Sequence, residues 1–307
     1  MEQRTLRIAS RQSQLALVQT RYIQSLIGGE IVGITSEGDV ELWQPLYTMP
    51  GVGVFVKQLE VEIVSRRADL AVHSLKDMPT QQPPELYLAA VPRFTTPRGD
   101  VAILKPGFTS LEDLPEGSIV GTSSLRRIAA LRHQYRHKNF TYSDIRGNLN
   151  TRIAKLNKGD YDCIILAEAG LQRLGWDDLN IFRLPEDVFL HAPAQAALGI
   201  ECRSDDEELI DYLKRIEDRE TRLRVDAERE FMKDLEGGCK LPIGVFTEII
   251  GDELRLIGQV WHPIENFTIR EEIKGPLSQA RELGRALSEI MKEKGGVDLL
   301  QSIRLAV

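Results

Sequence analysis

Four short segments of the sequence place hydroxyl and basic residues between a predicted strand and a predicted helix. They are residues 10–13, 73–77, 122–127, and 146–148 with Arg152. In a parallel sheet such turns converge at the carboxyl ends of the strands, where ligands bind. Helix N-termini there offer free N–H groups to an anion, and arginine adds a planar fork that matches a carboxylate. The pattern predicts a cleft for a small ligand with several carboxylates. The alternative is that these residues are ordinary helix caps and solvated arginines.

Asp77 is the acidic residue of this pattern. It follows a predicted buried strand and stands beside Lys76. A carboxylate in a cleft of arginines can stabilise a cationic intermediate or act as a general acid or base. The alternative is an aspartate that only closes a turn.

Cys239 is the cysteine best placed for chemistry. Gly237 and Gly238 precede it and allow another group to approach the sulfur closely, and Lys240 favours the thiolate. The alternative is an inert loop cysteine. Cys163, in contrast, lies in an apolar strand and is predicted to be a core residue, and His73 is predicted to be a buried strand histidine.

Metal binding is not predicted. The three cysteines include no CxxC pair, which argues against a zinc cluster or a disulfide framework. His133 and His137 have a spacing that can hold zinc, but no third ligand is evident nearby. No glycine-rich nucleotide motif is present either.

The composition is that of a globular protein. The chain has 307 residues, of which 42% are hydrophobic and 28% charged, and its formal net charge is −7. The negative charge argues against nucleic acid as a partner, whereas basic turns in an acidic protein suit small anions. No apolar run approaches the roughly 20 residues of a membrane span. The polar start of the chain lacks signal-peptide features, so we expect a cytoplasmic location.

The order of predicted elements gives the fold class. Up to about residue 200, strands alternate with helices, which predicts α/β structure with largely parallel sheets. The expected strands are 6–9, 69–73, 86–91, 101–104, 118–121, 140–142 and 163–166. Helices are expected over about 13–26, around 55–63, from Leu125, Asn148 and Ala169, and over 205–216. Residues 95–99 form a candidate linker. Strands at 245–250, 254–260 and 267–273, with a hairpin at Gly251-Asp252 and a helix over 278–293, predict a small α+β domain.

Taken together, six segments resemble one known family, porphobilinogen deaminase. They are residues 7–17, 69–79, 121–127, 146–152, 169–175 and 235–244, in the family's order. The resemblance implies two α/β lobes like those of periplasmic binding proteins, with the active site between them, and a small C-terminal α+β domain. The implied divisions are 1–94 plus 192–216, 99–191, and 217–307.

The resemblance also implies a chemistry. Cys239 would hold a dipyrromethane cofactor through a thioether, and Asp77 would assist loss of ammonia from porphobilinogen and stabilise the resulting cation. Four porphobilinogen molecules would add in turn, and water would release hydroxymethylbilane, a step of tetrapyrrole (heme) biosynthesis. The implied enzyme is a cytoplasmic, monomeric transferase without metal, membrane or nucleic-acid partners.

The same resemblance assigns binding roles to individual residues. The implied cofactor-binding residues are Ser74, Lys76, Asp77, Thr122, Ser123, Ser124, Arg126, Arg127, Arg146 and Gly147, together with Cys239. The implied substrate-binding residues are Arg11, Ser13, Arg146, Arg152, Arg173 and Gln195.

Two features depart from the family pattern. Gln195 lies between Ala194 and Ala196, where the family usually has glycines, which leaves the local backbone flexibility open. Residues 47–54, expected to form a lid, lack the lysines that many relatives carry, so we expect this lid to act by shape and water exclusion. A non-catalytic carboxylate binder with the same fold is the second hypothesis. Asp77 and Cys239 argue against it, because a simple binder needs neither.

Overall fold

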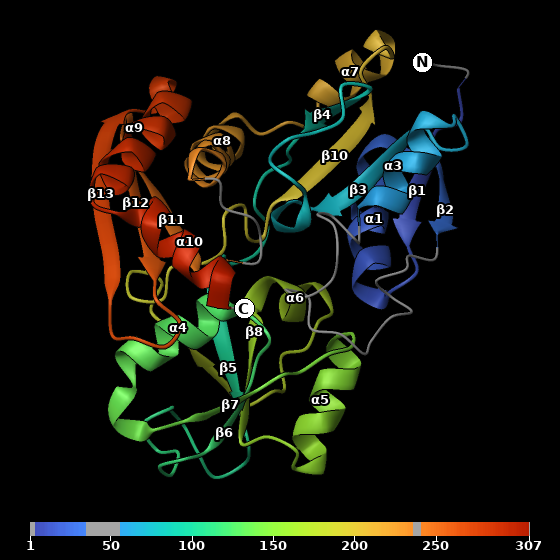
Figure 1. The fold of residues 1–307 in the computed structure, drawn as a ribbon. Helices are drawn as coiled ribbons and strands as arrows, with labels where there is room; N and C mark the ends of the chain where they lie inside the picture. The colour runs from blue at the N-terminus through green and yellow to red at the C-terminus, as the bar shows by residue number, and fades with distance from the viewer. Residues whose placement is uncertain (1–3, 35–55, 236–240, 307) are drawn as a thin grey trace.

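The computed structural model describes residues 4–34, 56–235 and 241–306, and its helices and strands form three bodies (Figure 1). Two of the bodies are α/β lobes and the third is a small sheet covered by helices. This confirms the predicted fold class. Cys239 and the expected lid at 47–54 lie outside the described residues. None of the described helices is long and apolar enough to cross a membrane.

The first lobe is built on a five-stranded sheet with helices on both faces. Its strands, in spatial order, are β2 (Glu30–Ile34), β1 (Arg7–Arg11), β3 (Leu70–Ser74), β10 (Leu198–Arg203) and β4 (Leu86–Ala90). Helices α1 (Gln14–Ile27) and α7 (Glu207–Lys214) pack on one face through Ile23 and Leu213. Helix α3 (Lys57–Val64) packs on the other face through Leu59 and Ile63. As predicted, His73 is buried in β3.

The second lobe repeats this plan. Its sheet has the order β7 (Thr141–Ser143), β6 (Ile119–Gly121), β8 (Cys163–Ala167), β5 (Asp100–Leu104) and β9 (Ile181–Arg183). Helix α4 (Leu125–Gln134) packs on one face through Ala129 and Leu131. Helices α5 (Leu149–Lys158) and α6 (Glu168–Arg173) cover the other through Leu156 and Leu171.

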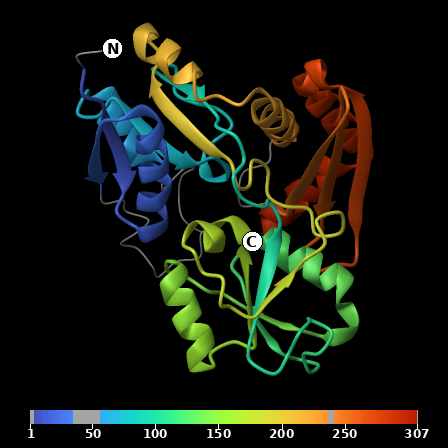
Figure 2. The same cartoon turned by 180° about the vertical axis from the view of Figure 1, so that it is seen from behind.

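The expectation of largely parallel sheets was wrong for one inner strand of each sheet. Strand β10 runs antiparallel to both of its neighbours, and so does β5. Each of these strands enters its sheet from the opposite lobe, so it arrives without a helical crossover on its own sheet. The chain passes to the second lobe between β4 and β5, and returns just before β10 (Figure 2). The returning strand β10 belongs to the first sheet, and the division of the chain into 1–94 plus 192–216, 99–191 and 217–307 stays a prediction.

The C-terminal body is an antiparallel meander with helices on one face. Strands β11 (Ile243–Ile250), β12 (Glu253–Trp261) and β13 (Thr268–Pro276) pair in chain order. Helices α8 (Arg219–Asp234), α9 (Ala280–Glu293) and α10 (Gly296–Ala306) belong to the same body. Phe231, Leu256 and Leu287 are core residues here. The sequence patterns did not predict α8 or α10.

One buried ion pair joins the three bodies. The carboxylate of Glu228, on α8, pairs with the Arg98 guanidinium in the passage between the lobes. It also accepts hydrogen bonds from the Thr247 hydroxyl of β11 (2.5 Å) and from the backbone N–H of Ala194 (2.8 Å). Although burial opposes its charge, Arg98 holds the pKa of Glu228 at about 2. The C-terminal body is therefore fixed to both passages between the lobes.

A second buried carboxylate, Asp69, stabilises the first lobe. It accepts hydrogen bonds from the side chains of Arg4 (2.7 Å) and Arg7 (3.1 Å) and from the Arg7 backbone N–H (2.8 Å). Burial alone would raise the pKa of Asp69, but these hydrogen bonds outweigh it and lower the pKa to about 2.

We predict that Asp69→Asn lowers the free energy of unfolding by about 2 kcal/mol near neutral pH. Because the folded-state pKa is depressed, the stabilisation is present above the unfolded pKa and is lost as the pH falls from about 4 to about 2. Denaturant melts of both proteins over this range test the prediction. A stability difference that persisted unchanged at the acid end would contradict it.

Candidate active site

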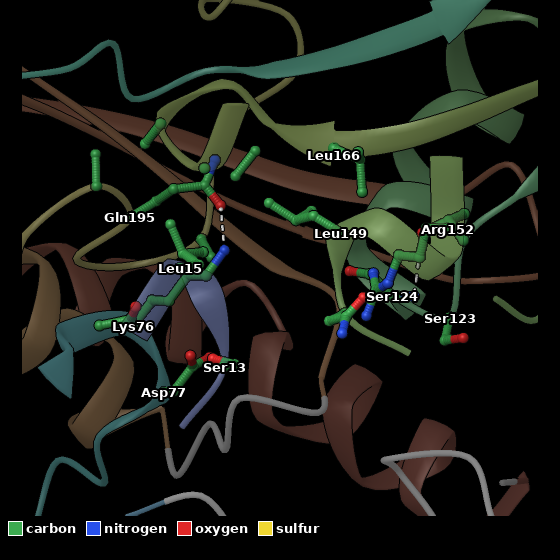
Figure 3. A pocket seen from close by; sticks show the side chains of 18 of the residues that line it. Ser13, Leu15, Lys76, Asp77, Ser123, Ser124, Leu149, Arg152, Leu166 and Gln195 are labelled. Atoms are coloured by element: carbon green, nitrogen blue, oxygen red, sulfur yellow. Dashed lines mark hydrogen bonds between the residues drawn. The ribbon is translucent and has the colours of Figure 1, made fainter. Parts of the chain in front are cut away.

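A cavity of about 660 Å³ lies between the two lobes, and the strand-end turns singled out in the sequence line it (Figure 3). Every predicted site residue within the described part of the chain is among its lining residues. Seven described lining side chains are basic and one, Asp77, is acidic. The basic residues are Arg11, Lys76, Arg126, Arg127, Arg146, Arg152 and Arg173. The cavity therefore suits an anionic ligand.

The first lobe contributes the ends of β1 and β3 to the cavity wall. Arg11 ends β1, and Ser13 caps α1 by accepting a hydrogen bond from a backbone N–H. Ser74 ends β3 and exchanges hydrogen bonds with the side-chain amide of Gln19 (3.1 and 3.2 Å). Lys76 and Asp77 follow on a single turn of 3₁₀ helix, Leu75–Asp77, which directs both side chains to the cavity.

Three hydroxyls of the second lobe organise the turn between β6 and α4. Thr122 accepts a hydrogen bond from the Ser124 backbone N–H (3.2 Å), and Ser124 caps α4. The Ser123 hydroxyl bonds both backbone groups of Ile145 (3.0 and 3.1 Å). These residues shape the wall, so the capping interpretation is correct for Ser124 and Ser13, although both also line the cavity.

Arg126 and Arg127 share one buried counter-ion, Asp100. Each donates an Nη group to a different oxygen of the Asp100 carboxylate, at 2.7 Å. The second Nη of Arg126 donates to the backbone oxygen of Leu190 (2.7 Å), and that of Arg127 to the oxygen of Ile165 (2.9 Å). The buried Nε of Arg127 has no protein partner among the described residues.

The turn before α5 brings two further arginines to the cavity. Gly147 has φ of +110°, and a Cβ there would lie 2.8 Å from Thr151, so the turn requires glycine. Arg152 donates its Nε to the Gly147 oxygen (2.9 Å). One Nη of Arg146 is buried without a partner among the described residues.

Gln195 lies where the returning chain enters the first lobe, and it bonds to both lobes. Its side-chain oxygen accepts from Lys76 Nζ (3.3 Å), and its amide nitrogen donates to Asp100 (3.0 Å). Figure 3 shows Lys76 and Gln195 pointing toward one another. Ala194 (φ 59°) and Ala196 (φ 70°) both adopt the left-handed conformation that favours glycine. The backbone around Gln195 is therefore strained.

Burial disfavours the positive charges that this cavity collects. It lowers the pKa of Lys76 to about 8, that of Arg152 to about 10 and that of Arg173 to about 10. Arg127 and Arg146 lower the pKa of Arg152 further by repulsion. An anionic ligand would relieve both effects. The free donors on Arg127 and Arg146 fit carboxylate groups of such a ligand.

Cys163 and Cys202 do not contribute to this site. Both are fully buried in strands, as predicted for Cys163. Burial raises the pKa of each thiol to about 12, so both thiols stay protonated near neutral pH. Met232, on α8, and Leu241 are the lining residues nearest in the sequence to 236–240.

Asp100 belongs to the site, although no sequence pattern pointed to it. It is the first residue of β5 and lies behind the cavity lining, so no turn motif points to it. An acidic residue at the start of an otherwise apolar strand, directly after Arg98-Gly99, was the available signal.

Comparison with known proteins assigns the family. A family model described as "Porphobilinogen deaminase, dipyromethane cofactor binding domain" matches residues 6–211, and "Porphobilinogen deaminase, C-terminal domain" matches residues 222–293. The chain belongs to the porphobilinogen deaminase family. A porphobilinogen deaminase from Nostoc sp. is 46% identical over 98% of this chain and 95% of its own length. One from Synechococcus elongatus is 44% identical over 98% and 96%.

The family membership gives the activity. Porphobilinogen deaminases are transferases, also called hydroxymethylbilane synthases, of tetrapyrrole biosynthesis, and this chain is one of these enzymes. It joins four porphobilinogen molecules head to tail, with loss of ammonia, on a dipyrromethane primer and releases hydroxymethylbilane.

Two solved structures resemble the chain at low identity. A putative methionine-binding lipoprotein from Bacillus subtilis has a TM-score of 0.41 at 11% identity, covering 70% of this chain and 91% of its own. The BvgS VFT2 domain from Bordetella pertussis has a TM-score of 0.39 at 12% identity, covering 70% and 87%. The fold assignment rests on the sheet topology above.

We predict that the Lys76 ammonium group titrates with a midpoint near pH 8 in ligand-free protein, because burial disfavours its charge. Asp77→Asn should lower this midpoint further, since the Asp77 carboxylate favours the charged lysine. NMR titration of ¹³C-labelled lysine measures both values. A midpoint at the ordinary lysine value of about 10.4 would contradict the burial argument.

Proposed function

We propose that this cavity is the site at which the deaminase holds its cofactor and joins porphobilinogen units. The observation that carries the proposal is the convergence of seven basic side chains on a cavity with one carboxylate, Asp77. The ligands of this reaction carry acetate and propionate groups, and the arginine forks match these carboxylates. The cavity volume lies in the range usual for small-molecule sites.

The proposed point of cofactor attachment is Cys239. Two observations support it. Cys163 and Cys202 are buried thiols with raised pKa values, which leaves Cys239 as the remaining cysteine. Cys239 also stands two residues before Leu241 in the sequence, and Leu241 is a lining residue of the cavity.

The bound dipyrromethane supplies the pyrrole carbon to which the first porphobilinogen is joined. In our proposal, Arg127 Nε and Arg146 Nη donate to its carboxylates, because these buried donors lack protein partners among the described residues. Its other proposed binding residues are Ser74, Lys76, Asp77, Thr122, Ser123, Ser124, Arg126 and Gly147. The proposed substrate-binding residues are Arg11, Ser13, Arg146, Arg152, Arg173 and Gln195.

Asp77 is the proposed catalytic residue. Loss of ammonia from the protonated aminomethyl group of porphobilinogen moves the positive charge onto the pyrrole ring, and a carboxylate beside the ring stabilises that cation. The basic side chains around it repel that cation and hold the substrate by its carboxylates instead. Asp77 thus supplies the favourable charge at the reacting carbon.

We further propose porphobilinogen as the small-molecule substrate of a cytoplasmic, monomeric enzyme that needs no metal, membrane or nucleic acid. The acidic net charge of −7 supports the absence of a nucleic-acid partner. The expected lid at 47–54 remains a proposal for the same cavity.

We predict that the intact mass of the purified protein includes one dipyrromethane and that Cys239→Ser removes it. Ehrlich's reagent should stain the unmodified protein for the same reason. Cys202→Ser is the matched control and should keep the adduct, because its thiol is buried in β10. An adduct retained in Cys239→Ser would exclude this attachment point.

We predict that Asp77→Asn lowers turnover about a hundredfold or more in folded, cofactor-loaded enzyme, because it removes the charge that stabilises the cation. Single-turnover rates with porphobilinogen measure the effect. Asp113→Asn is the control, since Asp113 bonds only within the exposed turn at Thr109 and lies outside the cavity lining. Near-normal turnover of Asp77→Asn would remove Asp77 from the chemistry.

A further inference from the structure

Asp100 is a buried carboxylate that contacts the cavity's cations from behind. It is 2% exposed and does not line the cavity. Its two oxygens accept hydrogen bonds of 2.7 Å from Arg126 and Arg127, and one of them also accepts from the Gln195 amide at 3.0 Å. Burial alone would raise the pKa of Asp100, but the two arginines hold it far below its usual range. The group is therefore a permanent negative charge.

The carboxylate fixes the planes of two guanidinium groups. Arg126 donates one Nη to Asp100 and the other to the Leu190 backbone oxygen. Arg127 donates one Nη to Asp100 and the other to the Ile165 backbone oxygen. Its buried Nε has no protein partner among the described residues. Because a guanidinium group is planar, these two anchors determine the direction in which Nε donates.

The same carboxylate is connected to the opposite lobe. Gln195 donates to Asp100 through its amide nitrogen and accepts from Lys76 through its oxygen. Asp100 lies on β5 of the second sheet, whereas Lys76 follows β3 of the first. The Gln195 side chain therefore bridges Lys76 of the first lobe and Asp100 of the second. The left-handed Ala194 and Ala196 hold that amide in the strained turn.

We propose that Asp100 is a positioning residue, which orients Arg126 and Arg127 for the carboxylates of the dipyrromethane and, through Gln195, places Lys76 opposite them. The inference rests on the proposed function of the cavity. Asp100 itself is not among the residues that line the cavity. Without its charge, three cations would face the cavity with no common anchor, and repulsion would separate the guanidinium groups. Part of the binding free energy would then be used to orient the two guanidinium groups, which Asp100 already orients in the free protein.

Asp100→Asn tests this role, because it keeps the shape and removes the charge. We expect the fraction of purified protein that carries a dipyrromethane, read from intact mass, to fall about tenfold or more. Residual loaded enzyme should show a raised KM and a smaller change in kcat. A folded Asp100→Asn enzyme with full loading and unchanged KM and kcat would overturn the proposal.

Asp69→Asn is the matched control. Asp69 is also a buried carboxylate shared by arginines, Arg4, Arg7 and Arg203, but it lies in the first lobe outside the cavity lining. It should lose stability and keep normal loading. Equal loss of loading in both variants would mean that Asp100 acts through stability alone, which would overturn the proposal.

A second variant decides the matter if Asp100→Asn does not fold. Asp100→Glu keeps the counter-charge for both arginines but moves the carboxylate forward by one methylene. We expect a folded, loaded enzyme with a raised KM, because the arginines are displaced. An unchanged KM would contradict a positioning role.

One outcome separates this proposal from the proposed function. If the unmodified protein carries no dipyrromethane, the cofactor assignment fails, and the Lys76 titration then tests Asp100 by itself. Asp100 favours the charged form of Lys76, so Asp100→Asn should lower the pKa of Lys76 and Asp69→Asn should not. An unchanged midpoint in Asp100→Asn would refute the connection between the two lobes.

Discussion

Repulsion among the basic side chains is the constraint that the site must meet before any ligand arrives. Four of the arginines meet it by donating to backbone carbonyl groups of four different segments. Arg126, Arg127, Arg152 and Arg173 donate to the oxygens of Leu190, Ile165, Gly147 and Ala196, respectively. A carbonyl group carries partial negative charge without a proton to gain, so these anchors hold at any ordinary pH. The fold has to bring these carbonyl groups together, and the arrangement of strands and turns around the cavity follows from that requirement.

The attachment of the C-terminal body meets a related constraint at the back of the cavity. Glu228 is a fully buried acid, and it is tolerated because Arg98, Thr247 and Ala194 together satisfy both of its oxygens. Arg98 lies on the passage between β4 and β5, Thr247 on β11, and Ala194 on the passage between β9 and β10. Helix α8, which carries Glu228, also contributes Met232 to the cavity wall. The contacts of Glu228 therefore fix the helix that precedes Cys239 in the sequence.

The four turns at the strand ends line the cavity as predicted, because local patterns determine them, whereas Arg173 and Gln195 were expected only from the family resemblance. Ser13, Ser124 and Asn148 cap helices that start within a residue or two of the predicted positions. Strand direction was not predictable in this way, because periodicity is the same for parallel and antiparallel strands. Apolar periodicity did not predict helix α8, because its buried positions include Glu228 and Arg229. The partners of these two residues come from distant segments. Asp100 was missed for the same reason. Cys239 and residues 47–54 lie outside the described chain, so their expected roles remain predictions.

The two passages between the lobes are also bonded to each other. The Gln195 amide donates to the Arg98 backbone oxygen (2.7 Å), and Arg98 Nε donates to the Gln195 backbone oxygen (3.5 Å). A single tether would let one lobe twist freely against the other. Two tethers locked together leave bending about one axis as the soft motion, with twist and sliding resisted by this pair of bonds. These bonds therefore favour a hinge between the lobes, about which Asp77 of the first lobe stays opposite the arginines of the second.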